Sequence, residues 1–346
     1  MARESEARAV SLVDLPVIRR LGGQATVLES AIEYTQGVNE PNTSTLTNLL
    51  LPNRSVHTLI ARADKQQVVG QYRLRDDEQN AHIIYLAPAL THGMEDTAWL
   101  HMLDTMAREA GQRDAHALIA EVREDSCLFE TMRAAGFAVY SRRQIWQRLP
   151  NVAPIPEDNG VAVVPEGAED LPGVQSLIAQ IVPPLMQPFV MPGGHADGWV
   201  YRKNGQVMAY IAATTGKLGI YFMPFVHPDA IGDTKYIIAS LMRQVPKADR
   251  LPVAVCVGRY LDWMGATLER MHFEPASRQA VMVRHMTAGV RQAEWKPVEA
   301  TNNSAVAGSA NPPSMVVRRL ATVMKFLIGV KTKLKERIWK DMSLTI

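Results

Sequence analysis

The sequence predicts an α/β fold made of two mixed-sheet domains in tandem, followed by a basic amphipathic helix. The tandem is indicated by an internal repeat. Within each copy, antiparallel strand signals give way to alternating strands and helices, which is typical of a mixed α/β sheet. The separate helix is indicated by the charge of the last 32 residues, which carry a net +6 and leave −4 for the rest of the chain.

Composition limits the class of protein. The chain has 346 residues, of which 47% are hydrophobic and 21% charged, as in globular proteins with two domains. The net charge of +2 indicates no nucleic-acid partner. Cys127 and Cys256 form neither a metal-binding nor a disulfide pattern. We therefore expect no metal, and we expect a cytoplasmic location. No apolar run has the length of a signal peptide or a membrane span.

The repeat is clearest at two junctions, YLAPALTHGMEDTAW (85–99) and YFMPFVHPDAIGDTK (221–235). Their spacing of 136 residues brings ten identical pairs together, whereas VDLP (13–16) meets EDLP (169–172) at a spacing of 156. The first copy therefore carries about twenty extra residues near 37–55. The expected domains are 8–149 and 161–287, joined by the Pro-rich linker LPNVAPIPEDNG (149–160).

The elements of each copy follow one order. A short strand leads into Asp-Leu-Pro and a helix, for which Asp14 and Asp170 are expected N-caps. A β-hairpin follows, and Asn204-Gly205 in the second copy predicts a turn with positive φ. Next come the junction strand and a helix, then a buried strand, a second helix and a closing strand.

This order of elements resembles the fold of the GCN5-related N-acetyltransferases. The resemblance rests on Asp-Leu-Pro at the first helix, the apolar strand ending in x-x-Pro, and the helix-Gly-Phe ending of CLFETMRAAGF (127–137). It implies that acetyl-CoA lies in a split between two central parallel strands. It also implies that backbone N–H groups of a Gly-rich turn hold the pyrophosphate, and that the substrate is an amine.

The first copy departs from the family's cofactor turn. Thr91, Met94 and Asp96 stand where Arg or Gln and two glycines are expected, and carboxylates there repel a pyrophosphate. In the second copy, His227, Ala230 and Gly232 occupy these positions, which leaves a weakened phosphate turn. Any cofactor is therefore expected in the second copy, at Phe222, Met223, His227, Ala230, Ile231, Gly232 and Asp233.

The family's catalytic groups are missing. Met132 and Leu268 stand at the position of the proton-donating Tyr, and neither junction strand carries a carboxylate, so no catalytic residue is identified. Two hypotheses follow: an acyl-CoA-dependent N-acetyltransferase, or a catalytically silent protein that uses the fold to bind a partner. The two hypotheses differ in the split between the strands ending near Met223 and Val257. An open split favours the acetyltransferase, and a filled split favours the silent protein.

Other side chains allow two interpretations each. Arg142, Arg143 and Arg148 form either an anion site or a solvated edge strand. Tyr85 and Tyr221 are proton donors or packed strand residues, and the two cysteines are buried small residues or nucleophiles. The loop 183–199 covers the acceptor substrate or is an ordinary surface loop.

The C-terminal segment is expected to be a separate unit. Residues 291–314 are a polar linker, and 315–341 form a basic amphipathic helix with apolar residues at spacings of three and four. Three interpretations stay open: peripheral binding to an anionic membrane surface, pairing with a partner helix, or packing on the protein's own domains.

Overall fold

The computed structural model describes residues 6–286 except 38–54, 64–65, 77, 157–158 and 191–195. The expected linker 291–314 and helix 315–341 lie outside the described residues, as does most of the insertion near 37–55. The described strands form one continuous sheet in the order β1-β3-β4-β5-β6-β13-β7-β12-β11-β10-β9-β8, and β2 pairs with β5. The α/β fold class with a mixed sheet is confirmed.

The first copy supplies the elements of one half. They are β1 (Glu6–Ala9), η1 (Leu12–Asp14), α1 (Leu15–Gly22), β2 (Thr26–Val27), α2 (Ser30–Thr35), β3 (Val56–Ala63), β4 (Gln66–Arg73), β5 (Asn80–Ala87), α4 (Thr97–Gln112), β6 (Ala117–Arg123), α5 (Cys127–Ala134) and β7 (Ala138–Arg148).

The second copy supplies the other half. Its elements are β8 (Val163–Pro165), η2 (Ala168–Asp170), α6 (Leu171–Ile181), α7 (Gln187–Val190), β9 (Asp197–Lys203), β10 (Gln206–Thr215), β11 (Ile220–Val226), η3 (Pro228–Asp233), α8 (Thr234–Gln244), β12 (Val253–Gly258), η4 (Arg259–Met264), α9 (Gly265–Arg270) and β13 (Glu274–His285). The hairpin turn at Asn204 and Gly205 has φ of 53° and 79°, as expected.

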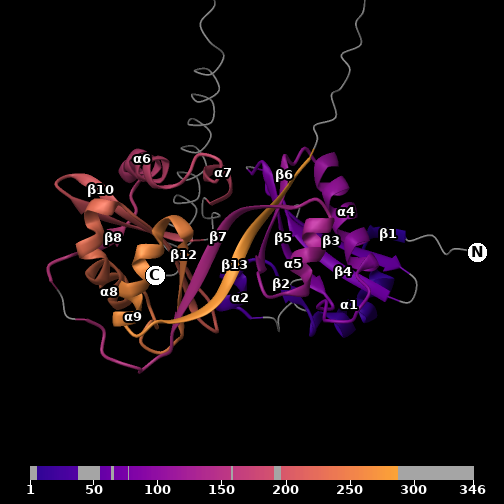
Figure 1. Cartoon of the computed structure of the whole chain (residues 1–346), viewed down its shortest axis with the longest axis horizontal. Helices are drawn as coiled ribbons and strands as arrows, with labels where there is room; N and C mark the ends of the chain where they lie inside the picture. Colours follow the sequence, from indigo (N-terminus) through magenta and orange to yellow (C-terminus); the bar gives the residue numbers. More distant parts are fainter. Residues whose placement is uncertain are drawn as a thin grey trace, which may run out of the picture. The chain divides into compact units, whose positions relative to one another are not determined.

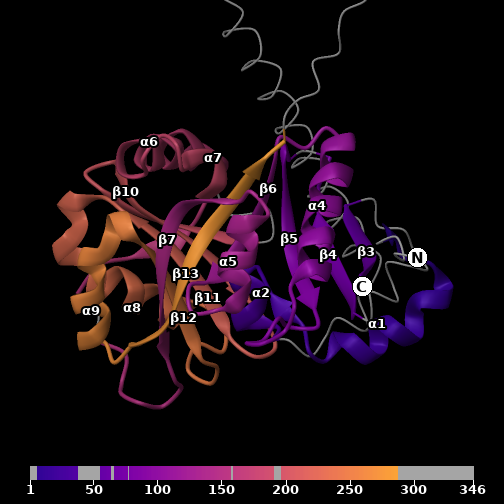
Figure 2. The ribbon, with the colours of Figure 1, turned by 45° about the vertical axis from the view of Figure 1, so that its right-hand side comes forward.

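The two copies exchange their last strands (Figure 1). β13 of the second copy pairs antiparallel with β6 of the first, and β7 of the first copy pairs antiparallel with β12 of the second. β7 and β13 also pair with each other in the middle of the sheet, where Figure 2 shows them side by side. Each half of the sheet is therefore completed by a strand from the other repeat.

The apolar core follows this exchange. One buried cluster packs α4 and α5 on the first half and includes Ala280 and Met282 of β13. A second cluster packs α8 and α9 on the other half and includes Trp146 of β7. Since both clusters need a strand of the other repeat, the burial of apolar surface links the two halves.

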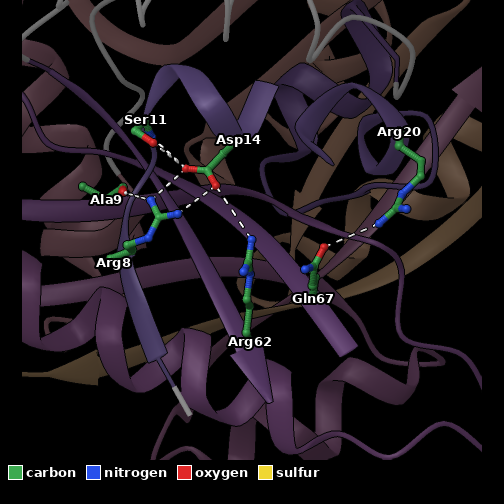
Figure 3. Close-up of polar contacts among 7 residues, drawn as sticks. All are labelled: Arg8, Ala9, Ser11, Asp14, Arg20, Arg62 and Gln67. Carbon is green, nitrogen blue, oxygen red and sulfur yellow. Dashed lines mark hydrogen bonds and ion pairs between the residues drawn. The ribbon is translucent and has the colours of Figure 1, made fainter. Parts of the chain in front are cut away.

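The Asp-Leu-Pro aspartates have a different role from the expected one. Asp14 and Asp170 stand at the N-cap positions of α1 and α6, but neither side chain caps the helix. Asp14 is 2% exposed and accepts hydrogen bonds from both terminal nitrogens of Arg8, at 2.7 and 2.8 Å, and from Ser11 (Figure 3). Asp170, 3% exposed, accepts from Nε and Nη2 of Arg202 in β9 through one carboxylate oxygen. Each aspartate thus anchors its helix to a neighbouring strand.

The expectation of a solvated edge strand at 142–148 is wrong for two of its arginines. β7 is a central strand, and Arg143 and Arg148 are each 5% exposed. Arg148 donates to the carbonyl oxygens of Met271 and Ala153, so it joins the end of β7 to the segment after α9 and to the linker between the repeats. The sheet's edges are instead the short strands β1 and β8, which offer little backbone for edge-to-edge pairing.

Candidate functional site

The two halves each contain a split between parallel strands, at the place where the resemblance puts the cofactor. In the first half, β5 and β6 pair only from Asn80–Ala117 to His82–Ile119. In the second half, β11 and β12 pair only from Ile220–Val253 to Phe222–Val255. Beyond these residues the strands separate, and the two splits differ in what lies between them.

The first split is filled by the chain itself. Thr26 and Val27 of β2 pair with Leu86 and Tyr85 of β5. The Leu28 N–H donates to the Ile84 carbonyl at 2.8 Å, and the Leu28 carbonyl accepts from the Glu121 N–H of β6 at 2.9 Å. Residues 26–28 therefore bridge both strands and use the backbone groups that a ligand in this split would need.

A buried ion pair holds this segment in place. Glu121 accepts from the Ser30 N–H at 2.8 Å, directly after the bridging residues, and from Arg143 of β7 at 2.5 Å. Burial acts to raise the pKa of Glu121, but the Arg143 charge and the Ser30 hydrogen bonds outweigh it and hold this pKa below its ordinary value. The pair thus fixes the start of α2 and joins β6 to β7 across the exchanged strand.

Helix α2 continues from this anchor to the second half. Its Tyr34 ring stacks on Tyr221 of β11 at 6.4 Å between centroids, and the Tyr34 hydroxyl lies 2.9 Å from Ser277 Oγ. The Thr35 carbonyl accepts from the Leu218 N–H at 2.9 Å, in the turn between β10 and β11. Tyr221 is 3% exposed, as is typical of a packed strand residue.

The second split has no such bridging segment among the described residues. The spacing of 156 puts Pro183 and Pro184 where Val27 and Leu28 stand in the first copy. Proline has no N–H, so Pro184 cannot make the hydrogen bond that Leu28 makes to its strand. Beyond Phe222, β11 is paired with β10 on its other side.

Tyr260 contacts both apolar clusters of the second half. It stands two residues after the end of β12, in η4, and packs against the clusters on both sides of the sheet, one under α8 and one under α6. Burial raises the pKa of Tyr260 to about 12, and the nearby Arg143 charge acts in the opposite direction. Sequence reasoning missed this residue, because it searched for a tyrosine at Leu268; the Tyr shortly after the buried strand was the available signal.

The residues expected to hold the cofactor lie in two environments. Phe222 is buried under α8, whereas Met223 packs on the opposite face beside Tyr260 and Tyr34. His227 precedes η3, and Ala230 is buried within it. Ile231 is 47% exposed, and a Cβ on Gly232 would meet no atom within 4 Å.

The N-terminal amides of η3 are already bonded. Pro228 has no N–H, the Asp229 N–H donates to His227 Nδ1 at 3.2 Å, and the Ala230 N–H donates to the His227 carbonyl at 2.9 Å. The turn therefore presents fewer free donors to an anion than the sequence indicates.

The charge of Asp233, which would oppose a pyrophosphate, is compensated. Its carboxylate accepts from Lys203 Nζ at 2.8 Å and from the Tyr201 hydroxyl at 3.0 Å. These contacts hold the pKa of Asp233 below its ordinary value, with the Lys203 hydrogen bond as the largest cause. Sequence reasoning did not include Lys203 or Tyr201, because both come from the preceding hairpin.

Two further searches of the described part of the chain bear on function. No group of three or more His, Cys, Asp or Glu side chains there is placed to hold a metal ion. No helix there is long and apolar enough to cross a membrane.

Comparison with known proteins supports the fold. No protein-family model matches the sequence, and no curated protein matches it. A GCN5-related N-acetyltransferase from Sphaerobacter thermophilus superposes with a TM-score of 0.50 at 12% identity, covering 81% of this chain and 95% of that chain. A tandem GNAT protein from the clavulanic acid biosynthesis pathway gives 0.49 at 16% identity, covering 82% and 98%. A GCN5-related N-acetyltransferase from Kribbella flavida gives a TM-score of 0.46 at 16% identity, covering 70% of this chain and 93% of that chain.

The chain has the fold of the GCN5-related N-acetyltransferases, as the sequence predicts. Since one fold serves many functions, activity has to be argued from the site.

Proposed function

We propose that this protein is an N-acyltransferase of the GCN5-related fold that binds acyl-CoA in its second half, with the first half as support. The difference between the two splits carries the proposal. Residues 26–28 use the strand edges of the first split, whereas Pro183 and Pro184 stand at the corresponding positions of the second copy and no described segment bridges β11 and β12. A strand edge offers N–H and C=O groups to a ligand that itself contains amides.

The residues that would hold the cofactor are those along this edge and at the following turn. The backbone groups of Pro224 and Val226, which point away from β10, would face the amide-containing arm, while Lys203 and Gly232 lie at the turn expected to face the pyrophosphate. Bound acetyl-CoA would supply the acyl group. The acceptor is an amine-bearing molecule, in keeping with the fold.

Among the residues that the structure describes, Tyr260 is the group best placed to handle a proton beside the split. With a pKa raised to about 12, its hydroxyl keeps its proton at neutral pH and is a hydrogen-bond donor there. β11 carries no carboxylate, so the split itself leaves water as the base for the acceptor amine.

A second candidate function is a catalytically silent protein that uses the fold to hold a partner. The bonded amides of η3 favour it, because the first turn then has no free N–H for a pyrophosphate. The position of Tyr260 between the two clusters also favours it.

Calorimetric titration of acetyl-CoA into the full chain separates the two candidates. The informative variant is Gly232→Glu, since a Cβ there meets no atom within 4 Å and the substitution adds charge to the turn. Its control is Met94→Glu, which adds the same charge at an exposed position of the first half's junction, two residues before Asp96, the counterpart of Gly232.

The acyltransferase proposal predicts binding that Gly232→Glu weakens at least about tenfold, or about 1.4 kcal/mol, and that Met94→Glu leaves unchanged. Absence of binding, or equal losses in both variants, would favour the silent protein.

A further inference from the structure

A group of polar side chains at the end of β4 and the start of β5 has hydrogen-bonding capacity that the described structure does not use. Among the described residues, five buried side-chain atoms have no hydrogen-bond partner. Three of the five lie here: Arg73 Nε, Arg75 Nη2 and Glu78 Oε2. Unpartnered buried polar atoms are rare and costly in folded proteins, so their concentration in one place indicates a ligand.

The remaining atoms of these side chains are fixed. Arg73 binds Glu29 through both terminal nitrogens, at 2.9 and 3.3 Å, and Arg75 binds Glu78 Oε1 at 2.8 Å. The arginine side chains are only 11% and 16% exposed. The unused atoms therefore belong to side chains that are already oriented, which lowers the entropic cost of binding a ligand.

His82 lies beside this group, directly opposite Arg73 in the β4–β5 register. Burial, followed by the charge of Arg73, lowers the pKa of His82 to about 4, so its ring is neutral at pH 7. No hydrogen bond reaches the ring within the described residues. Its ring provides one further donor and one further acceptor.

The charges in this group are balanced. Arg73 is matched by Glu29, and Arg75 by Glu78. Adding an ion to a buried, charge-balanced group leaves that ion without a partner, so a neutral ligand is favoured over a carboxylate or phosphate. A ligand that satisfies the unused atoms needs a hydrogen-bond acceptor facing the two arginines and a hydrogen-bond donor facing Glu78.

We propose that Arg73, Arg75, Glu78 and His82 form a binding site for a neutral small molecule that carries a carboxamide group. The carboxamide oxygen accepts from Arg73 Nε–H and Arg75 Nη2–H, and its N–H donates to Glu78 Oε2. The site lies on the first half, at the end of β4 and the start of β5, and it does not depend on the acyltransferase proposal.

Acetamide and acetate are the probes, because they share their shape and differ in charge. NMR of the full chain would follow the Arg73 Nε–H signal and the His82 ring signals during each titration. We expect acetamide to give saturable shifts with a Kd on the order of 1 mM, as befits so small a ligand, and acetate to bind at least about tenfold more weakly. Saturable binding of acetate at a concentration equal to or lower than that needed for acetamide would contradict the proposal that the ligand is neutral.

Arg75→Gln tests the site, and Arg133→Gln is its matched control. Both arginines pair with a glutamate three residues away, but Arg133 and Glu130 are exposed at 59% and 71%. We expect Arg75→Gln to weaken acetamide binding at least about tenfold and Arg133→Gln to leave it unchanged.

Glu78→Gln provides a second variant, should Arg75→Gln fail to fold. It removes the acceptor charge from the turn between the strands, and the same weakening is expected. Absence of any saturable shift in the unaltered chain would mean that only water meets these atoms and would overturn the proposal.

Discussion

At the residue scale, buried carboxylates join different elements of secondary structure. Asp14 joins α1 to β1, and Glu121 joins α2 to β7. Both were visible in the sequence only as isolated acids, and Asp14 was interpreted as a helix cap. Its true partner could not be read from the motif, because Arg8 lies on the strand before it.

Replacing Asp14 by Asn should lower the free energy of unfolding by about 1–2 kcal/mol at pH 7, a modest value because Arg8 is 38% exposed. The Arg8 hydrogen bond, the largest cause, holds the pKa of Asp14 well below its usual range. The stabilisation is thus present above the unfolded pKa of about 4 and is lost as pH falls further. Denaturant unfolding across this range should show the two proteins converging in acid.

The control for Asp14 is Asp125→Asn, which breaks an ion pair exposed at 49% and 71% and should cost little. An Asp14→Asn penalty that persists unchanged down to pH 2 would contradict the assignment.

Replacing Glu121 by Gln should cost about 3–5 kcal/mol, because it leaves the buried Arg143 without a charged partner. The adjacent pair of Arg142 and Glu124 also joins β7 to the β6 side of the sheet but is exposed at 52% and 25%. Glu124→Gln should therefore cost under about 1 kcal/mol. Similar urea midpoints for unfolding of the two variants would show that the buried pair stabilises the protein no more than the exposed pair does.

At the scale of elements, helix α2 and the bridging segment before it connect the two halves. The sequence predicted the hairpins, the junction strands and the following helices, because periodicity and Asn204-Gly205 mark them locally. It did not predict that residues 26–28 enter the first split, since that depends on partners nearly sixty residues and more away. Tyr260 was missed for a different reason, because the tyrosine was sought at Leu268.

Gly219 is required where α2 meets the second half. A Cβ at Gly219 would overlap the Tyr34 carbonyl oxygen, and it would lie 3.1 Å from the Pro252 carbonyl oxygen. We expect Gly219→Ala to destabilise the protein by about 1–3 kcal/mol, measured by thermal unfolding. Gly232→Ala is the control, because its Cβ meets no atom within 4 Å. Equal midpoints would mean that α2 moves aside at no cost.

At the scale of the whole molecule, the exchange of β7 and β13 makes the two repeats dependent on each other. The repeat predicts tandem domains at 8–149 and 161–287, and those boundaries remain a prediction for the sequence units. Pairing across repeats was not predictable, because β7 and β13 stand at corresponding places in their copies and each would by analogy pair within its own copy.

A fragment ending at residue 149 should not fold alone, since it lacks the β13 residues Ala280 and Met282 of its core. Mixing it with residues 150–290 should restore a cooperative unfolding transition, measured by circular dichroism. A stable, monomeric fragment 1–149 would show that the exchange is not needed for folding.

The central claim is that the second split, not the first, receives acyl-CoA. Amide hydrogen exchange of the full chain with and without acetyl-CoA tests it directly. The account predicts added protection in the second half, at Val226 in β11 and in the turn before α8, with residues 24–30 and 84–87 unchanged. Protection confined to the first split, or none at saturating cofactor, would contradict it.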